Sequence, residues 1–153
     1  MFDIYLTSEV VPESATTAKA VYGKIHIGNY VETFISSLAL WGREQYRASW
    51  TQALQRVVDG VGPSALITSY VKPVLPDDFL IWWPLYPVGE TVYVRNELLF
   101  YRQLLAPFSL DHPWESVRER RVTNAEGIRI SEWVTTTQSI RECLERKLPR
   151  VSG

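Results

Sequence analysis

Hydrophobic residues recur at every second position in two stretches near the start of the chain. The alternation runs over 2–6 and again over 22–34. A spacing of two places these side chains on one face of a β-sheet, so we expect a short first strand and a second strand over 22–34. Gly28-Asn29 within the second stretch favours a bulge or a tight bend. The small residues of 14–20 predict a flexible loop between the two strands.

A helical spacing replaces the alternation over 43–59 and again over 138–147. In the first segment the apolar side chains form a single stripe, made of Tyr46, Trp50, Ala53, Leu54 and Val57. Such a stripe packs a helix against a core. Gly60 and Pro63 end this helix, and Pro149 follows the second one.

Further apolar runs predict strands joined by short turns. The stretch 64–70 is typical of an interior strand. Runs over 79–86 and 91–99 flank a short loop that contains a glycine, and they predict a hairpin. Pro84 lies within the first of these runs and is expected to place it at a sheet edge or at a bulge.

A second hairpin, between 117–122 and 128–136, completes the expected elements. The order of strands and helices contains no repeated βαβ unit. We therefore predict an α+β fold, in which an antiparallel β-sheet of about six strands packs against a main helix over 43–59, with a C-terminal helix over 138–147. The length of 153 residues fits a single domain over 1–153.

Composition limits the classes of function. With 16 basic and 17 acidic residues the formal net charge is -1, whereas a domain that binds nucleic acid is normally strongly basic. We therefore expect no direct nucleic-acid partner. The apolar run over 79–86 is far shorter than the roughly 20 residues of a membrane-spanning helix, and no secretory leader is recognisable. These features predict a cytoplasmic protein without membrane contact, and the single cysteine, Cys143, fits a reducing compartment.

Side chains that carry chemistry are sparse in this sequence. The two histidines, His26 and His112, belong to no recognisable nucleophile or zinc motif. Calcium loops and phosphate-binding glycine loops are also missing, so we expect no metal site and no cofactor. An enzyme that assembles His26, His112 and a distant carboxylate stays open as an alternative, as does an adaptor subunit of a larger complex.

Two pairs of adjacent residues are candidates for a functional surface. Asp77-Asp78, just before a predicted strand, can be a turn with a cap, or a pair of carboxylates that serves acid/base chemistry or binds a cation. Trp82 and Trp83 are neighbours within a strand, so their side chains face opposite sides of the sheet. Either an exposed tryptophan anchors a partner together with Tyr86, or burial under the first helix accounts for it.

A cluster of arginines is a third candidate. Arg118, Arg120 and Arg121 can meet phosphates, or they can form cross-strand ion pairs with Glu119 and Glu132 on a solvated strand.

Five groups of residues carry a family resemblance. They are 22–34 (YGKIHIGNYVETF), Trp41 and Tyr46 with 50–54 (WTQAL), 64–69 (SALITS), 82–86 (WWPLY) and 130–133 (ISEW). Together these strings resemble the immunity proteins of bacterial contact-dependent growth inhibition systems and related polymorphic toxins. The resemblance extends over most of the chain, and it contains no catalytic signature.

The resemblance implies a small cytoplasmic protein that binds the toxic C-terminal domain delivered by a sibling cell. That toxin is often a nuclease, and inhibition is by stoichiometric occupancy. Because the resemblance identifies no contact residues, the predicted toxin-binding surface rests on physics: an acidic and aromatic patch that would mimic nucleic acid toward a basic nuclease. Its residues are Asp77, Asp78, Trp82, Trp83, Tyr86 and Glu90.

Overall fold

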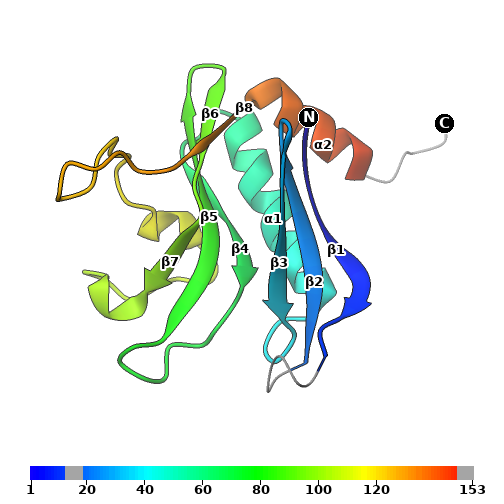
Figure 1. Ribbon diagram of the computed structural model, residues 1–153, viewed down its shortest axis with the longest axis vertical. Helices are drawn as coiled ribbons and strands as arrows, with labels where there is room; N and C mark the ends of the chain where they lie inside the picture. Colours follow the sequence, from blue (N-terminus) through cyan, green and yellow to red (C-terminus); the bar gives the residue numbers. More distant parts are fainter. Residues whose placement is uncertain (13–18, 148–153) are drawn as a thin grey trace.

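The computed structural model, which describes residues 1–12 and 19–147, contains two antiparallel sheets (Figure 1). The first sheet holds three strands in chain order: β1 (Phe2–Val10), β2 (Ala20–Ile27) and β3 (Tyr30–Ser37). The second sheet has the order β4-β5-β6-β8, with β7 also paired to β5; its strands are β4 (Ser64–Ser69), β5 (Phe79–Val88), β6 (Thr91–Val94), β7 (Glu97–Phe100) and β8 (Trp133–Thr136). The helical elements are α1 (Arg43–Val58), α2 (Thr137–Lys147) and the 3-10 turns η1 (Tyr101–Gln103) and η2 (Pro113–Ser116).

The predicted α+β class and the antiparallel pairing are confirmed, but the strands form two sheets where one was expected. The stretch 22–34, expected to be one strand, belongs to two, because Gly28 turns the chain with a φ of 62°. A positive φ is readily adopted by glycine. Of the loop expected over 14–20, residues 14–18 lie outside the described residues, and Ala20 already belongs to β2.

The helix α1 connects the two sheets and lies behind both of them in Figure 1. The five residues of its predicted stripe are all buried. The Tyr46 hydroxyl donates a hydrogen bond to the Ser37 carbonyl at the end of β3 (2.7 Å), and Trp50 Nε1 donates to the Ile67 carbonyl in β4 (2.7 Å). One helix face therefore supplies hydrophobic contact and polar anchors to both sheets at once.

Pro84 lies in the middle of its sheet, so the expectation of an edge strand is wrong, while the expected irregularity is present. The carbonyl of Pro84 accepts a hydrogen bond from the Arg95 amide (3.1 Å). Because proline has no amide hydrogen to offer on this side, the ladder is interrupted between Val94 and Glu97. The run expected as one strand over 91–99 is therefore split into β6 and β7.

The second expected hairpin is confirmed at its turn, where Gly127 has a φ of 80° and the Asn124 and Ile130 amides donate to the carbonyls of Ile128 and Val122 (2.8 and 2.9 Å). The long strands expected over 117–122 and 128–136 are not formed. One isolated bridge joins Thr123 to Arg129, and regular pairing begins only at Trp133. The physical reason is that side chains, not a backbone ladder, attach this segment to the sheet: the Arg120 guanidinium lies 3.7 Å from the centre of the Tyr93 ring. We call residues 101–132 the loop layer. Its Phe108 packs against Trp82 on the face of the five-stranded sheet away from α1, whereas η2 lies beside β4, where the Trp114 ring is 4.1 Å from the guanidinium of Arg56 in α1.

The free edge of β1 is covered by basic side chains. Arg146 and Lys147 at the end of α2 donate hydrogen bonds to the carbonyls of Phe2 (2.7 Å) and Ile4 (2.5 Å), and Arg43 donates to the Thr7 carbonyl (2.8 Å). These contacts satisfy backbone acceptors that another chain would otherwise pair with. Within the described residues, no helix has the length and apolar composition needed to cross a bilayer.

Candidate functional site

The two histidines are not brought together. His26 lies on β2, where its Nε2 is 3.0 Å from the Tyr5 hydroxyl. His112 precedes η2 on the loop layer and is 4.0 Å from a Glu115 carboxylate oxygen. Figure 1 shows these elements on opposite sides of the molecule. An enzymatic site built from both histidines therefore lacks its geometric basis.

Trp82 and Trp83 are both buried, with exposed fractions of 1% and 0%. Their side chains do face opposite sides of the sheet, as expected, but neither side is open. Trp83 lies 5.5 Å from the Trp133 ring, and Trp82 lies 6.4 Å from Phe108 of the loop layer. The expectation that one tryptophan is an exposed anchor is wrong, because the loop layer covers the second face of the sheet.

Asp77 is exposed and Asp78 is half-buried on the connection between β4 and β5. Asp77 forms an ion pair with Arg102 (2.8 Å). One Asp78 oxygen accepts hydrogen bonds from the amides of Val74 (3.0 Å) and Leu75 (2.6 Å), which confirms the interpretation of this pair as a turn with a cap. Asp78 is thus tied to the local backbone, whereas the Asp77 side chain remains accessible.

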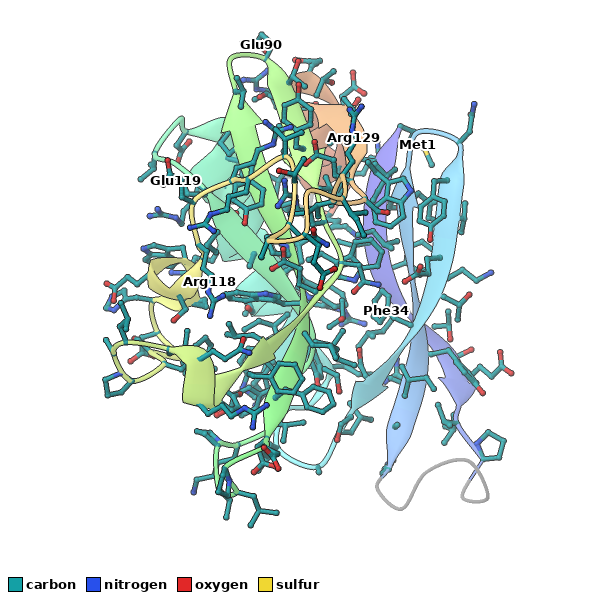
Figure 2. All side chains as sticks on the ribbon, turned by 60° about the vertical axis from the view of Figure 1, so that its left-hand side comes forward. Met1, Phe34, Glu90, Arg118, Glu119 and Arg129 are labelled. Atoms are coloured by element: carbon teal, nitrogen blue, oxygen red, sulfur yellow. The ribbon has the colours of Figure 1, made fainter. Side chains whose placement is uncertain are left out.

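The six predicted surface residues do not form one patch. Glu90 lies at the tip of the β5–β6 hairpin, and Figure 2 shows this tip far from the middle of the sheet. The ten residues of β5 separate Glu90 from Asp78, a distance of roughly 30 Å along an extended strand. Tyr86, almost fully buried, turns toward the Arg95 guanidinium, which lies 5.2 Å from its ring centre.

A cleft of about 700 Å³ opens between the sheet and the loop layer. Figure 2, in which this layer comes forward, shows Arg118 and Glu119 on the segment beside it. We call it the Glu97 cleft. Its lining includes Tyr86, Arg95, Glu97, Leu105, Arg118 and Arg121.

The floor of the cleft is held by a buried group of charges. Arg95, 3% exposed, donates to Glu132 (3.1 Å) and to the Arg121 carbonyl, and Arg120 pairs with the other oxygen of Glu132. Burial alone would raise the pKa of Glu132, but hydrogen bonds from Arg120 and Arg95 hold it below its usual value. The carboxylate therefore stays ionised and fixes the loop layer to the sheet.

Glu97 is the exception in this cleft. Its carboxyl is half-buried, and burial raises its pKa more than the attraction of Arg95 and Arg118 lowers it. Among the residues that the structure describes, none donates a hydrogen bond to this carboxyl. A partly dehydrated charge without a donor is energetically unfavourable.

The sequence pointed to part of this site. One prediction was that the arginine cluster forms ion pairs with Glu132, and the contact of Arg120 with Glu132 confirms it. The sequence offered no signal for Arg95, Glu97 or Leu105, because the cleft is lined by several short stretches spread between Tyr86 and Ile130.

The fold is that of a small α+β protein in which an irregular segment packs over an antiparallel sheet and leaves a cleft between the two. The chain belongs to the family described as CdiI N-terminal domain, whose model matches residues 36–143. The resemblance recognised in the sequence is therefore confirmed.

Two relatives extend the comparison. The chain is 29% identical over 140 residues to a protein named Immunity protein CdiI from Enterobacter cloacae, a match that covers 92% of this chain and 94% of the relative. It is also similar to a chain in a solved structure titled CdiA-CT/CdiI toxin and immunity complex from Enterobacter cloacae. That match has a TM-score of 0.80 and 26% identity, and it covers 95% of this chain and 97% of the other.

Proposed function

We propose that this protein is an immunity protein of a contact-dependent growth inhibition system, which binds the C-terminal domain of its cognate CdiA-type toxin. The observation that carries the proposal is the solved toxin and immunity complex, since it contains a chain that matches this one over nearly the full length of both. The family model and the similarity to a CdiI immunity protein support the same role.

The mode of action in this proposal is occupancy and not turnover. One immunity protein covers one toxin domain and blocks the surface on which the toxin acts. We place this encounter in the cytoplasm. The chain acts as one domain over 1–153, because a single cluster of buried residues includes strands of both sheets and both helices.

A direct test is protection of cells. Expression of the toxin domain encoded beside the gene of this protein should stop growth, and co-expression of this protein should restore it. A control strain that expresses the same toxin together with a CdiI protein specific for a different toxin should stay inhibited. If growth stays arrested although this protein is folded and abundant, the proposal is contradicted and the adaptor alternative is favoured.

That the toxin is a nuclease stays a prediction. That the toxin contacts an acidic surface of this protein also stays a prediction. Of the six residues proposed for that surface, Asp77 and Glu90 are the carboxylates whose side chains are exposed and make no backbone hydrogen bond. We expect Asp77→Lys to weaken toxin binding about tenfold, because a basic partner would be repelled. Asp78 is a poor test residue, since its carboxylate also holds the turn.

The Asp77→Lys measurement is a calorimetric titration, with His112→Ala as control. His112 is exposed and is not one of the six residues proposed for the acidic surface, so its replacement should leave binding unchanged. If the Asp77→Lys protein binds the toxin with full affinity, Asp77 is not part of the interface. Loss of function in the His112→Ala protein with intact folding would favour the enzymatic alternative.

A further inference from the structure

We infer that the Glu97 cleft is the central pocket of the toxin-binding surface, and that it receives a basic side chain, Lys or Arg, of the toxin against the Glu97 carboxylate. This inference rests on the proposed function, because it names the place and the chemistry of the same interaction. Four observations support it.

The first observation is the state of Glu97. Its carboxyl is half-buried without a hydrogen-bond donor among the described residues, and burial raises its pKa. A group in this situation lowers the stability of the free protein at neutral pH. A basic side chain from a partner would supply both the missing charge and the missing donors, so the free energy lost in folding is recovered on binding.

The second observation is the apolar rim of the cleft. Leu105 is fully exposed and Leu98 is 49% exposed, and both line the cleft. An exposed leucine side chain contributes little to folding. Apolar side chains around a charged centre are typical of the ring that excludes water from a binding hot spot.

The third observation is rigidity. The Arg95–Glu132–Arg120 group fixes the floor and one wall of the cleft before any partner arrives. A preformed pocket loses less conformational entropy on binding than a loop that must first become ordered. The cleft of about 700 Å³ is large enough to accept a long side chain.

The fourth observation decides the sign of the charge that the pocket accepts. Arg118 and Arg121 are exposed, so water already solvates their guanidinium groups, and Arg118 also donates to the Gln103 carbonyl (3.2 Å). Arg95 already donates through Nε to Glu132 and through Nη2 to the Arg121 carbonyl. Glu97 is therefore the group in the cleft with the most to gain from a new partner, and that partner is a cation.

The test is a calorimetric titration of the toxin domain with the full-length protein and its Glu97→Gln variant. The substitution keeps the shape and removes the charge. We expect binding to weaken at least about tenfold, while the variant unfolds at a temperature equal to or higher than the wild type. Loss of affinity with unreduced stability is a result that a purely structural role of Glu97 would not give.

Matched controls separate the cleft from its surroundings. Glu119→Gln removes a carboxylate that is exposed at the rim of the same cleft, and it should change affinity less than about threefold. Leu105→Ser should weaken binding without affecting stability. Val61→Ser alters another exposed apolar side chain, 60% accessible and outside the cleft, and it should change neither binding nor stability.

The outcomes are distinct. If the wild type binds and Glu97→Gln binds equally well, the inference is overturned while the proposed function stands. If Arg118→Ala weakens binding and Glu97→Gln strengthens it, the pocket accepts an acidic group and the inference is again wrong. If the wild type itself does not bind the folded toxin, the proposed function fails and takes this inference with it.

Discussion

At the scale of single residues, Gly23 shows how closely the first sheet is packed. A Cβ atom added there would lie 2.3 Å from the ring of Phe34, which itself packs against Trp50 at a centroid distance of 6.0 Å. Because the ring has little room to move, we expect Gly23→Ala to lower the free energy of unfolding by about 1–3 kcal/mol. Urea denaturation measures this loss. In a Phe34→Leu background the same substitution should cost much less, and equal costs in both backgrounds would refute the steric explanation.

Glu132 is the residue on which the charges beneath the cleft depend. Glu132→Gln would leave Arg95 buried without its ionic partner, so we expect a loss of about 3–5 kcal/mol at pH 7. The folded-state pKa of Glu132 is lowered, so its contribution is present above the unfolded pKa of about 4.3 and is lost as the pH falls through the folded value. The variant should therefore lose less stability than the wild type on acidification below about pH 4. Parallel acid profiles of the two proteins would contradict this account.

Glu97 has the opposite dependence on pH. Its folded-state pKa is raised, so ionisation of this carboxyl reduces stability as the pH rises from the unfolded value near 4.3 through the folded one. We expect Glu97→Gln to remove this loss and to make the stability difference from the wild type grow between about pH 4 and neutrality. Thermal unfolding at a series of pH values measures the difference. A variant that is less stable than the wild type at pH 7 would show that Glu97 serves the fold.

At the scale of elements, α2 is held to β1 by its last turn. Arg146 and Lys147 bind backbone carbonyls of β1, and Lys147 also pairs with Asp3 (3.0 Å). Replacing both basic residues by Met should lower the free energy of unfolding by about 1–3 kcal/mol. It should also open the β1 edge to self-association, which light scattering after gel filtration detects. Arg141→Met, in the same helix, is the control, because Arg141 donates to the Gln138 side chain (2.6 Å) and not to β1. This variant should remain monomeric and stable to the same extent as the wild type.

Elements whose pattern is local could be predicted from the sequence. The stripe of α1 was identified residue by residue because burial of a helix face follows a single spacing. The long strands expected on either side of the 123–127 turn were predicted wrongly for the opposite reason. Arg95, Arg120 and Glu132 come together only after the chain has folded, and this contact replaces a backbone ladder that strand spacing alone would suggest.

At the scale of the whole molecule, the difference between local patterns and long-range contacts explains which parts of the candidate site could be predicted. The alternation in β5 correctly predicted that Trp82 and Trp83 lie on opposite faces of the sheet. The sequence near them did not indicate that the loop layer, which includes Phe108, folds back and buries the second face. The Glu97 cleft arises from that return of the chain. The family, in contrast, could be recognised from the sequence, because strings that build the core are continuous in the chain.

The central claim is that this protein neutralises a toxin by binding it. The most direct measurement is a calorimetric titration of the protein with the toxin domain encoded beside its gene, with the toxin's activity assayed on the same samples. The account predicts one-to-one binding with a Kd of roughly 1 nM or below, a free energy of about -12 kcal/mol, and loss of toxin activity in proportion to the complex formed. A folded toxin that shows no heat of binding and keeps full activity would contradict it.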